Sequence, residues 1–305
     1  MATYDVLDNT TNAKFIPTII AQEALGRLKS YLSVAKNVSR ASDFSTASFG
    51  QIIRVPVRGS VSANDKSQGE IYTKQNPTAT DVYVTLNKHK EVTFTIDDVT
   101  KVLENQNTIN GYGEDGAIAI AEAIESDLLA LHPNIENTKT WTDTSDATRD
   151  SSLLLIRKFF TDQKVPKSEQ KYLVVDSTVY NDLLGTDKFS RYDARGTGEQ
   201  ISSGQLIRAY GFEISESQLI PTSGSPVAYH NLAFAKNGLV LANRALPRPE
   251  GFGGNYAVIY DPDIQLAIRT LFWYNADLGA HQLTLDVLYG VAILDQRRVV
   301  EVEST

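Results

Sequence analysis

Apolar and polar residues alternate along three stretches in the first third of the chain. Residues 51–57, 82–86 and 92–96 each follow the period of two that is typical of a strand with one buried face. Pro56 predicts a sheet edge for the first of them, because proline cannot donate a ladder hydrogen bond. The polar residues 59–80, which join the first two stretches, are too many for an ordinary connection. We therefore expect a long hairpin with little core of its own, which must lean on another surface such as a neighbouring subunit.

A helical spacing of three and four residues appears twice. Residues 15–38 carry an apolar stripe, and residues 114–131 carry the clearest one, after the turn-rich stretch 105–113. Short helices and strands are mixed along the rest of the chain, so the predicted fold class is α+β. Further helices are predicted at 151–160 and 178–184, with strands at 171–175, 206–210, 212–215, 227–234, 239–242, 255–260 and 264–274, and a final strand pair, 281–289 and 291–302, around Gly290.

The composition of the chain excludes several kinds of functional site. The 305 residues include no cysteine and a single methionine, at position 1. This excludes disulfides, cysteine nucleophiles and thiolate metal sites. Hydrophobic residues make up 42% and charged residues 22%, which is typical of a folded globular protein. No apolar run approaches the roughly 20 residues that cross a bilayer, and the polar start does not resemble a signal peptide. We therefore expect a cytoplasmic protein with no membrane partner.

The net charge of −8 is concentrated in one stretch. Residues 111–150 hold 2 basic and 9 acidic residues, a net −7. Lysine and arginine are not clustered, which argues against a nucleic-acid-binding protein. Glu122 and Glu125 could form a carboxylate pair, but a solvated helix face is the preferred interpretation.

Candidate catalytic chemistry is sparse. His89, His132, His230 and His281 lie far apart along the chain without ligand spacing, so no metal site is expected. The motifs of zinc proteases, serine hydrolases and phosphate-binding loops do not occur. We predict no catalytic residue and no cofactor, and therefore that the protein is not an enzyme.

The order of short motifs along the chain resembles that of a known family. The motifs are Phe-Ile-Pro at 15–17, Gly-Gln-Ile-Ile-Arg-Val-Pro at 50–56, Val-Tyr-Val-Thr-Leu-Asn-Lys-His-Lys at 82–90, Phe-Thr-Ile-Asp-Asp at 94–98, Ile-Glu-Ser-Asp-Leu-Leu-Ala at 124–130, Tyr-Leu-Val-Val-Asp at 172–176 and Leu-Tyr-Gly-Val at 288–291. In this order and spacing the chain resembles the tailed-bacteriophage major capsid (coat) proteins of the Hong Kong 97 fold. The branch it resembles lacks a large fused scaffolding domain.

The resemblance implies a division of the chain into four parts. It implies an N-terminal arm, an extended loop, a peripheral domain whose long spine helix is 114–131, and an axial domain. Their expected ranges are 1–30 for the arm; 50–90 for the loop; 31–49, 91–149 and 240–278 for the peripheral domain; and 150–239 with 279–305 for the axial domain. The candidates for contacts between subunits are Phe15, Lys66, Glu70, Tyr72, Lys74, Arg191 and Arg195. The covalent Lys–Asn links of some family members are not expected, because neither an acidic catalyst nor an acceptor asparagine can be matched.

The resemblance also implies a structural function. Copies of the chain would assemble as hexamers and pentamers into an icosahedral phage head that encloses double-stranded DNA without sequence-specific contacts. The implied partners are a separate scaffolding protein, a portal and decoration proteins, and the implied location is the virion capsid after assembly in the host cytoplasm. If the acidic stretch 111–150 faced the interior, it would repel packaged DNA. Two alternatives stay open: an encapsulin-like nanocompartment shell and, with less support, a soluble enzyme.

Overall fold

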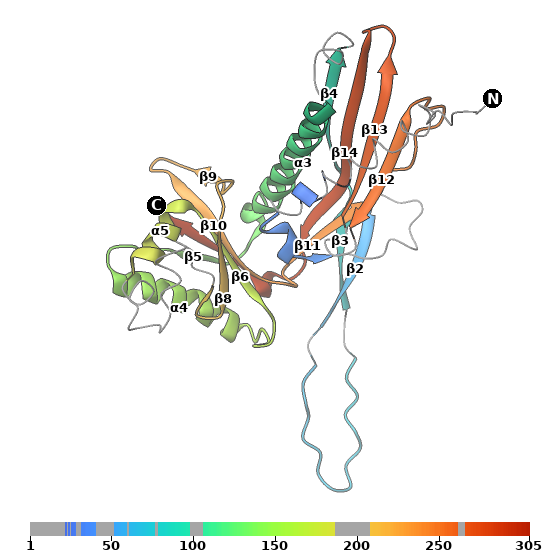
Figure 1. Ribbon diagram of the computed structural model, residues 1–305. Coiled ribbons are helices and arrows are strands. Elements are labelled where there is room, and N and C mark those ends of the chain that lie inside the picture. The colour runs from blue at the N-terminus through green and yellow to red at the C-terminus, as the bar shows by residue number, and fades with distance from the viewer. Residues whose placement is uncertain are drawn as a thin grey trace, which may run out of the picture.

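The computed structural model describes residues 52–59, 61–76, 79–97, 106–186, 208–261 and 266–305, with 22, 24, 26–28 and 32–40 of the N-terminal region. Most of the predicted arm, 1–30, therefore lies outside the described residues. Two sheets, three longer helices and one projecting hairpin make up the described part (Figure 1). No helix in these ranges combines the length and apolarity that a membrane span requires.

The first sheet is built around one long strand, β14 (Ala280–Ile293). Its strands run in the order β1-β11-β14-β13-β12, and β4 also pairs with β14. The helix α3 (Gln106–Leu129) lies along this sheet beside β4 and β14 (Figure 1). The other strands are β1 (Ser39–Arg40), β4 (Lys88–Asp97), β11 (Leu239–Arg244), β12 (Asn255–Asp261) and β13 (Leu266–Asn275).

Helix α3 begins eight residues earlier than the predicted 114, within the stretch that we expected to be a turn. Its apolar stripe is buried as predicted, with Ile120, Ile124 and Leu128 at the core. A Cβ at Gly116 would lie 2.7 Å from Leu285 Cδ1, so a glycine lets the helix approach β14 closely. At Gly116, this close packing outweighs the low helix propensity of glycine.

The second sheet is mixed and carries two helices on one face. Its order is β5-β15-β10-β6-β8-β7, and β9 pairs with β10. The strands are β5 (Thr138–Thr140), β6 (Lys171–Val175), β7 (Arg208–Ala209), β8 (Phe212–Glu216), β9 (Thr222–Ser223), β10 (Ala228–Ala235) and β15 (Val299–Ser304). The helices are α4 (Asp146–Asp162), whose N-terminus is capped by Ser145, and α5 (Ser177–Gly185), capped by Asp176. Three short 3₁₀ turns, η1 (Ala35–Asn37), η2 (His132–Asn134) and η3 (Gln296–Arg298), complete the described elements.

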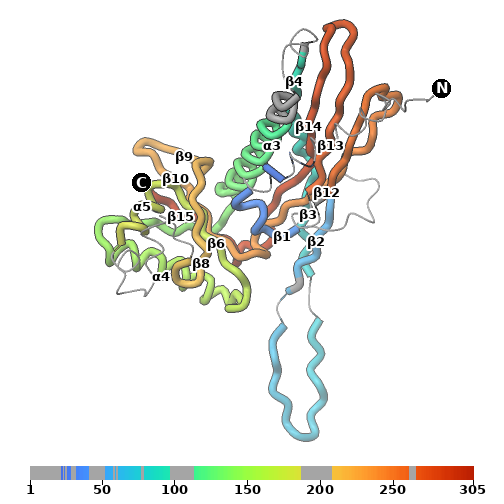
Figure 2. Tube along the Cα trace, in the orientation of Figure 1, coloured from blue at the N-terminus to red at the C-terminus, as the bar shows by residue number. Residues whose placement is uncertain are grey.

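The two sheets share one core. Along β6 and β10, Leu173 and Ala233 face the helices α4 and α5, whereas Tyr172 and Phe234 join the cluster that contains the buried stripe of α3. Strands buried on both faces read as continuous apolar runs, which explains the run Tyr-Leu-Val-Val in β6. The tube view shows the two bodies side by side with the hairpin projecting away from both (Figure 2).

The end of the chain differs from the prediction in two ways. β14 runs straight through Gly290 instead of ending there, so the expected strand pair around this glycine is wrong. In addition, β14 pairs with β13 and β4 of the first sheet and not with the strand that follows it. That strand, β15, belongs to the second sheet, where it pairs with β5 and β10.

Candidate functional site: an extended loop on a buried anchor

The hairpin forms as its pattern predicts. β2 (Ile52–Arg58) pairs with β3 (Ala79–Thr85) in an antiparallel register from Ile52 opposite Thr85 to Arg58 opposite Ala79. Arg54 and Asp81 form an ion pair across the two strands. Pro56 is consistent with this arrangement, since β2 has its only described partner on one side.

Beyond the paired strands, residues 61–76 form a tip that is exposed at every position. Hydrogen bonds within the tip join Ser62 to Gln75 and Ser67 to Glu70: the Ser62 amide donates to Gln75 Oε1 at 3.1 Å, and the Ser67 amide donates to Glu70 Oε2 at 3.1 Å. Contacts this local and this exposed stabilise the subunit little. In the tube and ribbon views the tip contacts neither sheet (Figures 1 and 2).

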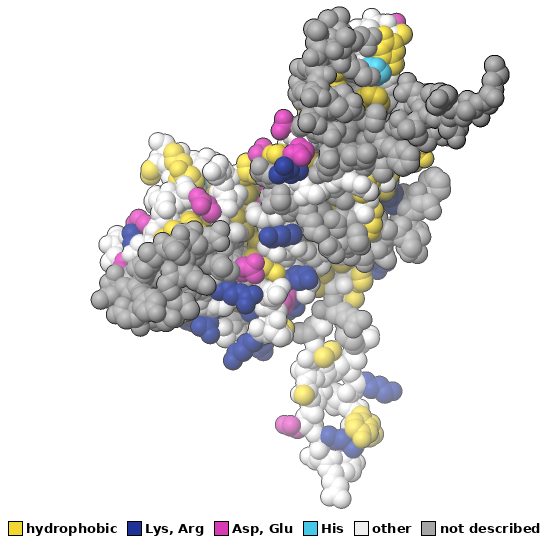
Figure 3. All heavy atoms as spheres, viewed as in Figure 1, with side chains coloured by type: hydrophobic (Ala, Val, Ile, Leu, Met, Phe, Trp, Pro, Cys, Tyr) yellow, Lys and Arg dark blue, Asp and Glu magenta, His cyan; other side chains and the backbone are white. Residues whose placement is uncertain are grey.

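The tip nevertheless carries large apolar side chains. Ile71 is 92% exposed, Tyr72 77% and Val61 67%. Lys66 lies over the ring of Tyr72, with Nζ 4.1 Å from the ring centroid. Apolar side chains and lysines gather side by side on the projecting loop in the space-filling view (Figure 3). Exposed apolar groups on a projecting element are typical of a surface that another molecule covers.

The base of the hairpin, in contrast, is anchored in the first sheet. Ile53, Val84 and Leu86 pack with Val240 and Ala242 of β11 in a separate small core. The end of β3 crosses β14 at Gly290, where a Cβ would lie only 2.2 Å from the Thr85 carbonyl oxygen. Glycine in the middle of this strand is therefore required by the close approach of another backbone.

A polar contact beside this crossing links β14 and the start of β4 to α3. Tyr289 of β14 donates from its hydroxyl to Asp127 Oδ2 at 2.5 Å, and Lys88 Nζ lies 2.8 Å from Asp127 Oδ1. Burial alone would raise the pKa of Asp127, but the hydrogen bonds from Lys88 and Tyr289 with the nearby charges of Lys88 and Lys90 bring it below its ordinary value. Asp127 is thus ionised and holds the start of β4 against the helix.

A second carboxylate of α3 fixes the segment before β1. Glu125 is 3% exposed and accepts hydrogen bonds from the amides of Val34 and Ala35, both at 2.9 Å, and from Ser33 Oγ at 3.0 Å. Burial raises the pKa of Glu125 above its ordinary value, and these hydrogen bonds oppose part of the shift. The expectation of a solvated face is therefore correct for Glu122, which is exposed, and wrong for Glu125.

Two of the four histidines meet in space, although they lie far apart in the sequence. His132 Nδ1 and His230 Nδ1 lie 3.2 and 2.6 Å from the same oxygen of Glu301, and Thr138 Oγ1 donates to the other oxygen at 3.0 Å. The trio satisfies the distances of a cation site. However, the rings stack with centroids 4.1 Å apart and planes 17° apart. An ion lies in the plane of each imidazole that binds it, and these two planes meet only far from the rings. The cluster therefore joins η2 to β10 and β15 by hydrogen bonds.

The acidic stretch 111–150 does not form one acidic face. Glu114 pairs with Arg27 at 2.8 Å, and Asp146 pairs with Arg149 at 3.3 Å. Glu125 is buried, Asp127 is paired with lysines, and the remaining exposed acids are spread over α3 and the loops that follow it. Cations from other segments thus pair with Glu114 and Asp127, whereas the partner of Asp146, Arg149, belongs to the stretch itself.

The predicted contact residues fall into two groups. Lys66, Glu70, Tyr72 and Lys74 all lie in the exposed tip, whereas Phe15, Arg191 and Arg195 lie outside the described residues. The sequence reasoning missed the anchor residues, Gly290 and Glu125 above all. A glycine inside an alternating strand pattern was the available signal for Gly290, while nothing local marks Glu125 as buried.

No protein-family model matches the sequence, and no curated protein is similar to it. Solved structures are similar in fold. A structure from Mycobacterium phage Che8 has a TM-score of 0.65 and 16% identity, over 89% of this chain and 90% of that one. The capsid of cyanophage P-SCSP1u has a TM-score of 0.64 and 13% identity, over 88% and 86%.

A third similar structure, a virus-like particle from Pyrococcus furiosus, has a TM-score of 0.53 and 11% identity, over 94% of this chain and 99% of that one. The similarity to the two phage structures covers 88–89% of this chain. The chain therefore has the α+β fold of phage capsid proteins, which confirms the fold class predicted from its sequence.

Proposed function

We propose that the protein is the major capsid protein of a tailed bacteriophage, which assembles into an icosahedral head around double-stranded DNA. The fold it shares with phage capsid proteins supports this function. The observation that carries the proposal is the tip of the hairpin, where Ile71 and Tyr72 stand exposed on a segment that its own subunit does not cover. A second copy of the chain is the partner that a repeating shell supplies.

In this proposal each region has a role in the shell. The tip, 61–76, overlaps a neighbouring subunit, and its Lys66, Glu70, Tyr72 and Lys74 make contacts there. The helix α3 acts as the spine of the peripheral body, and the second sheet points toward the centre of each hexamer or pentamer. A scaffolding protein, a portal and decoration proteins act as partners during assembly in the host cytoplasm, and the virion capsid is the final location. Stability comes from many repeated non-covalent contacts.

The alternatives predict different particles. A nanocompartment shell would have a similar fold and a different cargo; the lower TM-score of the virus-like particle, 0.53 against 0.65, favours the phage head. A soluble enzyme would remain a monomer or small oligomer. Electron microscopy of the purified protein, alone and with its scaffold, distinguishes closed particles from a subunit of 33.6 kDa.

The decisive variant removes the tip and keeps the anchor. Residues 59–78 are replaced by Asn-Gly, because the register ends with Arg58 opposite Ala79 and a two-residue turn closes such a pair. We expect a folded subunit with an unchanged circular dichroism spectrum and thermal transition that forms no particles. Sedimentation velocity and electron microscopy measure this.

The matched control keeps the tip length and replaces residues 61–76 by a Gly/Ser sequence. It should also fail to assemble, because the apolar side chains are gone while the loop remains. Normal particles from either variant would contradict the proposed role of the tip.

A further inference from the structure

A basic hollow lies on the body of the second sheet, apart from the hairpin. Its volume is about 380 Å³, and it is formed by one side of α4, the connection to β6 and the turn between β7 and β8. Arg157, Lys164, Lys167 and Lys171 line it together with Tyr210 and three uncharged residues. Lysine and arginine side chains gather along the lower side of this body in the space-filling view (Figure 3).

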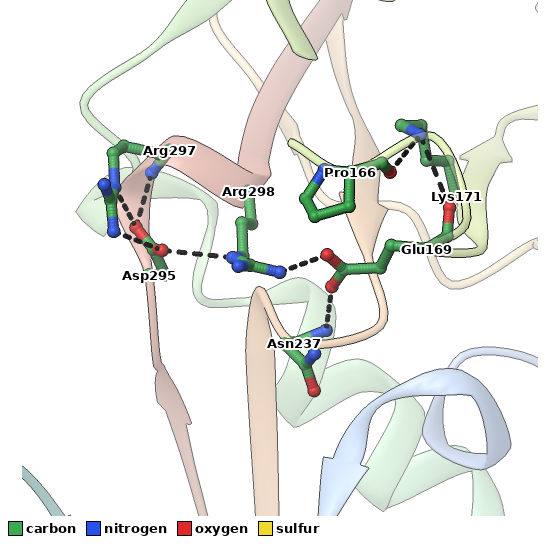
Figure 4. A network of polar contacts seen from close by, with 7 residues as sticks. All are labelled: Pro166, Glu169, Lys171, Asn237, Asp295, Arg297 and Arg298. Atoms are coloured by element: carbon green, nitrogen blue, oxygen red, sulfur yellow. Dashed lines mark hydrogen bonds and ion pairs between the residues drawn. The ribbon is translucent and has the colours of Figure 1, made fainter. Parts of the chain in front are cut away.

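The cations of the hollow differ from the arginines next to it. Arg297 is paired with Asp295 at 3.0 Å, and Arg298 bonds both Asp295 and Glu169 (Figure 4). In contrast, no carboxylate is among the described residues that line the hollow, and within the described ranges the charged ends of Arg157, Lys164 and Lys167 have no carboxylate partner. Among the described residues, carboxylates thus pair with the neighbouring arginines but not with Arg157, Lys164 or Lys167.

Lys171 shows that these charges act on one another. Its Nζ donates to the carbonyl oxygens of Pro166 and Glu169, both at 3.3 Å (Figure 4). Burial lowers the pKa of Lys171; the charge of Glu169 opposes this shift and the charge of Arg157 adds to it. An anion in the hollow would relieve this repulsion.

Lys164 occupies a position that the backbone makes unfavourable for a lysine. It follows the C-terminus of α4 with φ of 57°, and the next amide, of Val165, donates to the Phe160 carbonyl at 3.0 Å. This is the helix-ending arrangement in which glycine is preferred, because a Cβ costs about 1 kcal/mol there. A lysine also favours the negative end of the helix. The helix dipole therefore explains a cation near this end of α4. It does not explain why Lys164 stands at the one position where glycine is preferred.

We propose that the basic hollow binds the phosphate groups of a polyanion. Three flexible ammonium groups and one planar guanidinium surround a space at the lower end of the range for small-ligand sites, and this combination suits adjacent phosphates. The phosphates can come from a nucleic-acid backbone or from free polyphosphate and nucleotides. The site does not depend on shell assembly, because all its residues belong to one subunit.

The test measures binding to the full-length subunit with labelled adenosine triphosphate, tripolyphosphate and a short DNA duplex. Lys164→Gly removes the charge and suits the positive φ, so we expect a free energy of unfolding that is unchanged or higher and an affinity about tenfold lower for tripolyphosphate. The salt dependence of DNA binding should fall by about one charge. Lys158→Gln is the control, since Lys158 is exposed on the same helix but does not line the hollow.

The ligand arms identify the source of the phosphate. Binding of tripolyphosphate without the duplex assigns a free anion, and binding of the duplex with the same dependence on Lys164 assigns a nucleic acid. Equal losses in Lys164→Gly and Lys158→Gln, or a poly-glutamate peptide that binds as tightly as tripolyphosphate, would overturn the proposal in favour of a general basic surface.

Discussion

The tip of the hairpin and the C-terminal half of β10 show two extremes of burial among the described residues. Residues 61–76 are exposed throughout, whereas Leu232, Ala233, Phe234 and Ala235 are at most 1% exposed. Both segments contain large apolar side chains, but only those of β10 contribute to folding of the subunit. The apolar side chains of the tip are not buried when the subunit folds, which is why we propose that they contact other copies of the chain. If the proposed function holds, stability and assembly reside in separate regions that can be altered independently.

The largest effect on subunit stability is expected where the hairpin crosses β14. Gly290→Ala would place a methyl group 2.2 Å from the Thr85 carbonyl oxygen, so the backbones must separate. We expect a loss of about 3 kcal/mol in the free energy of unfolding, measured by chemical denaturation. Gly253→Ala is the control, because a Cβ there meets no atom within 4 Å. An equal loss in both variants would show that the crossing has no special role.

The joint at Glu125 should give the next largest effect. Glu125→Ala leaves the buried amides of Val34 and Ala35 without an acceptor, at an expected cost of about 2 kcal/mol. Because the pKa of Glu125 is raised in the folded state, the folded chain binds this proton more tightly than the unfolded chain. Its contribution is complete below the ordinary pKa and is lost as the pH rises through the folded-state pKa.

Denaturation curves at a series of pH values measure this dependence. Glu125→Gln cannot titrate, so its stability should lack the fall that wild type shows in that window. Parallel pH profiles for wild type and Glu125→Gln would mean that the carboxylate does not titrate differently in the two states.

The smallest effect on stability is expected at the tip. Ile71→Ser should change the free energy of unfolding by less than about 0.5 kcal/mol, because the side chain is already in water. It should nevertheless raise the subunit concentration needed for assembly by about tenfold, since burial of an isoleucine against a neighbour is lost. Light scattering during assembly measures this. The control Leu155→Ser changes an exposed leucine on α4, and an equal effect there would remove the distinction between the tip and the remaining surface.

Most elements were predictable because their evidence is local. The period of two in 51–57 and 82–86 predicted β2 and β3, and the helical stripe at 114–131 predicted most of α3. Errors arose where packing from elsewhere replaced the local signal. The path of β14 through Gly290 depends on β3, a strand that is distant in sequence.

The tip of the hairpin was likewise predictable from local sequence, whereas its anchor was not. The polar composition of 59–80 was sufficient to predict an exposed loop. The choice of Lys66, Glu70, Tyr72 and Lys74 as contact residues came from the family resemblance and stays a prediction. The anchor was not predictable, because it joins β3 to β14 and β11, about 160 to 200 positions further along the chain. The meeting of His132, His230 and Glu301 was missed for the same reason.

The sequence by itself determined which face of each strand and helix can be buried, because the spacing of apolar residues along the chain is a local property. It also determined that the loop 59–80 cannot bury its own apolar side chains, because it has too few of them to form a core. Only the tertiary structure decided which acids have cationic partners, that Gly290 cannot carry a side chain, and which cations line the basic hollow. Each of these depends on distances between residues that folding brings together, and such distances leave no periodic trace in the sequence.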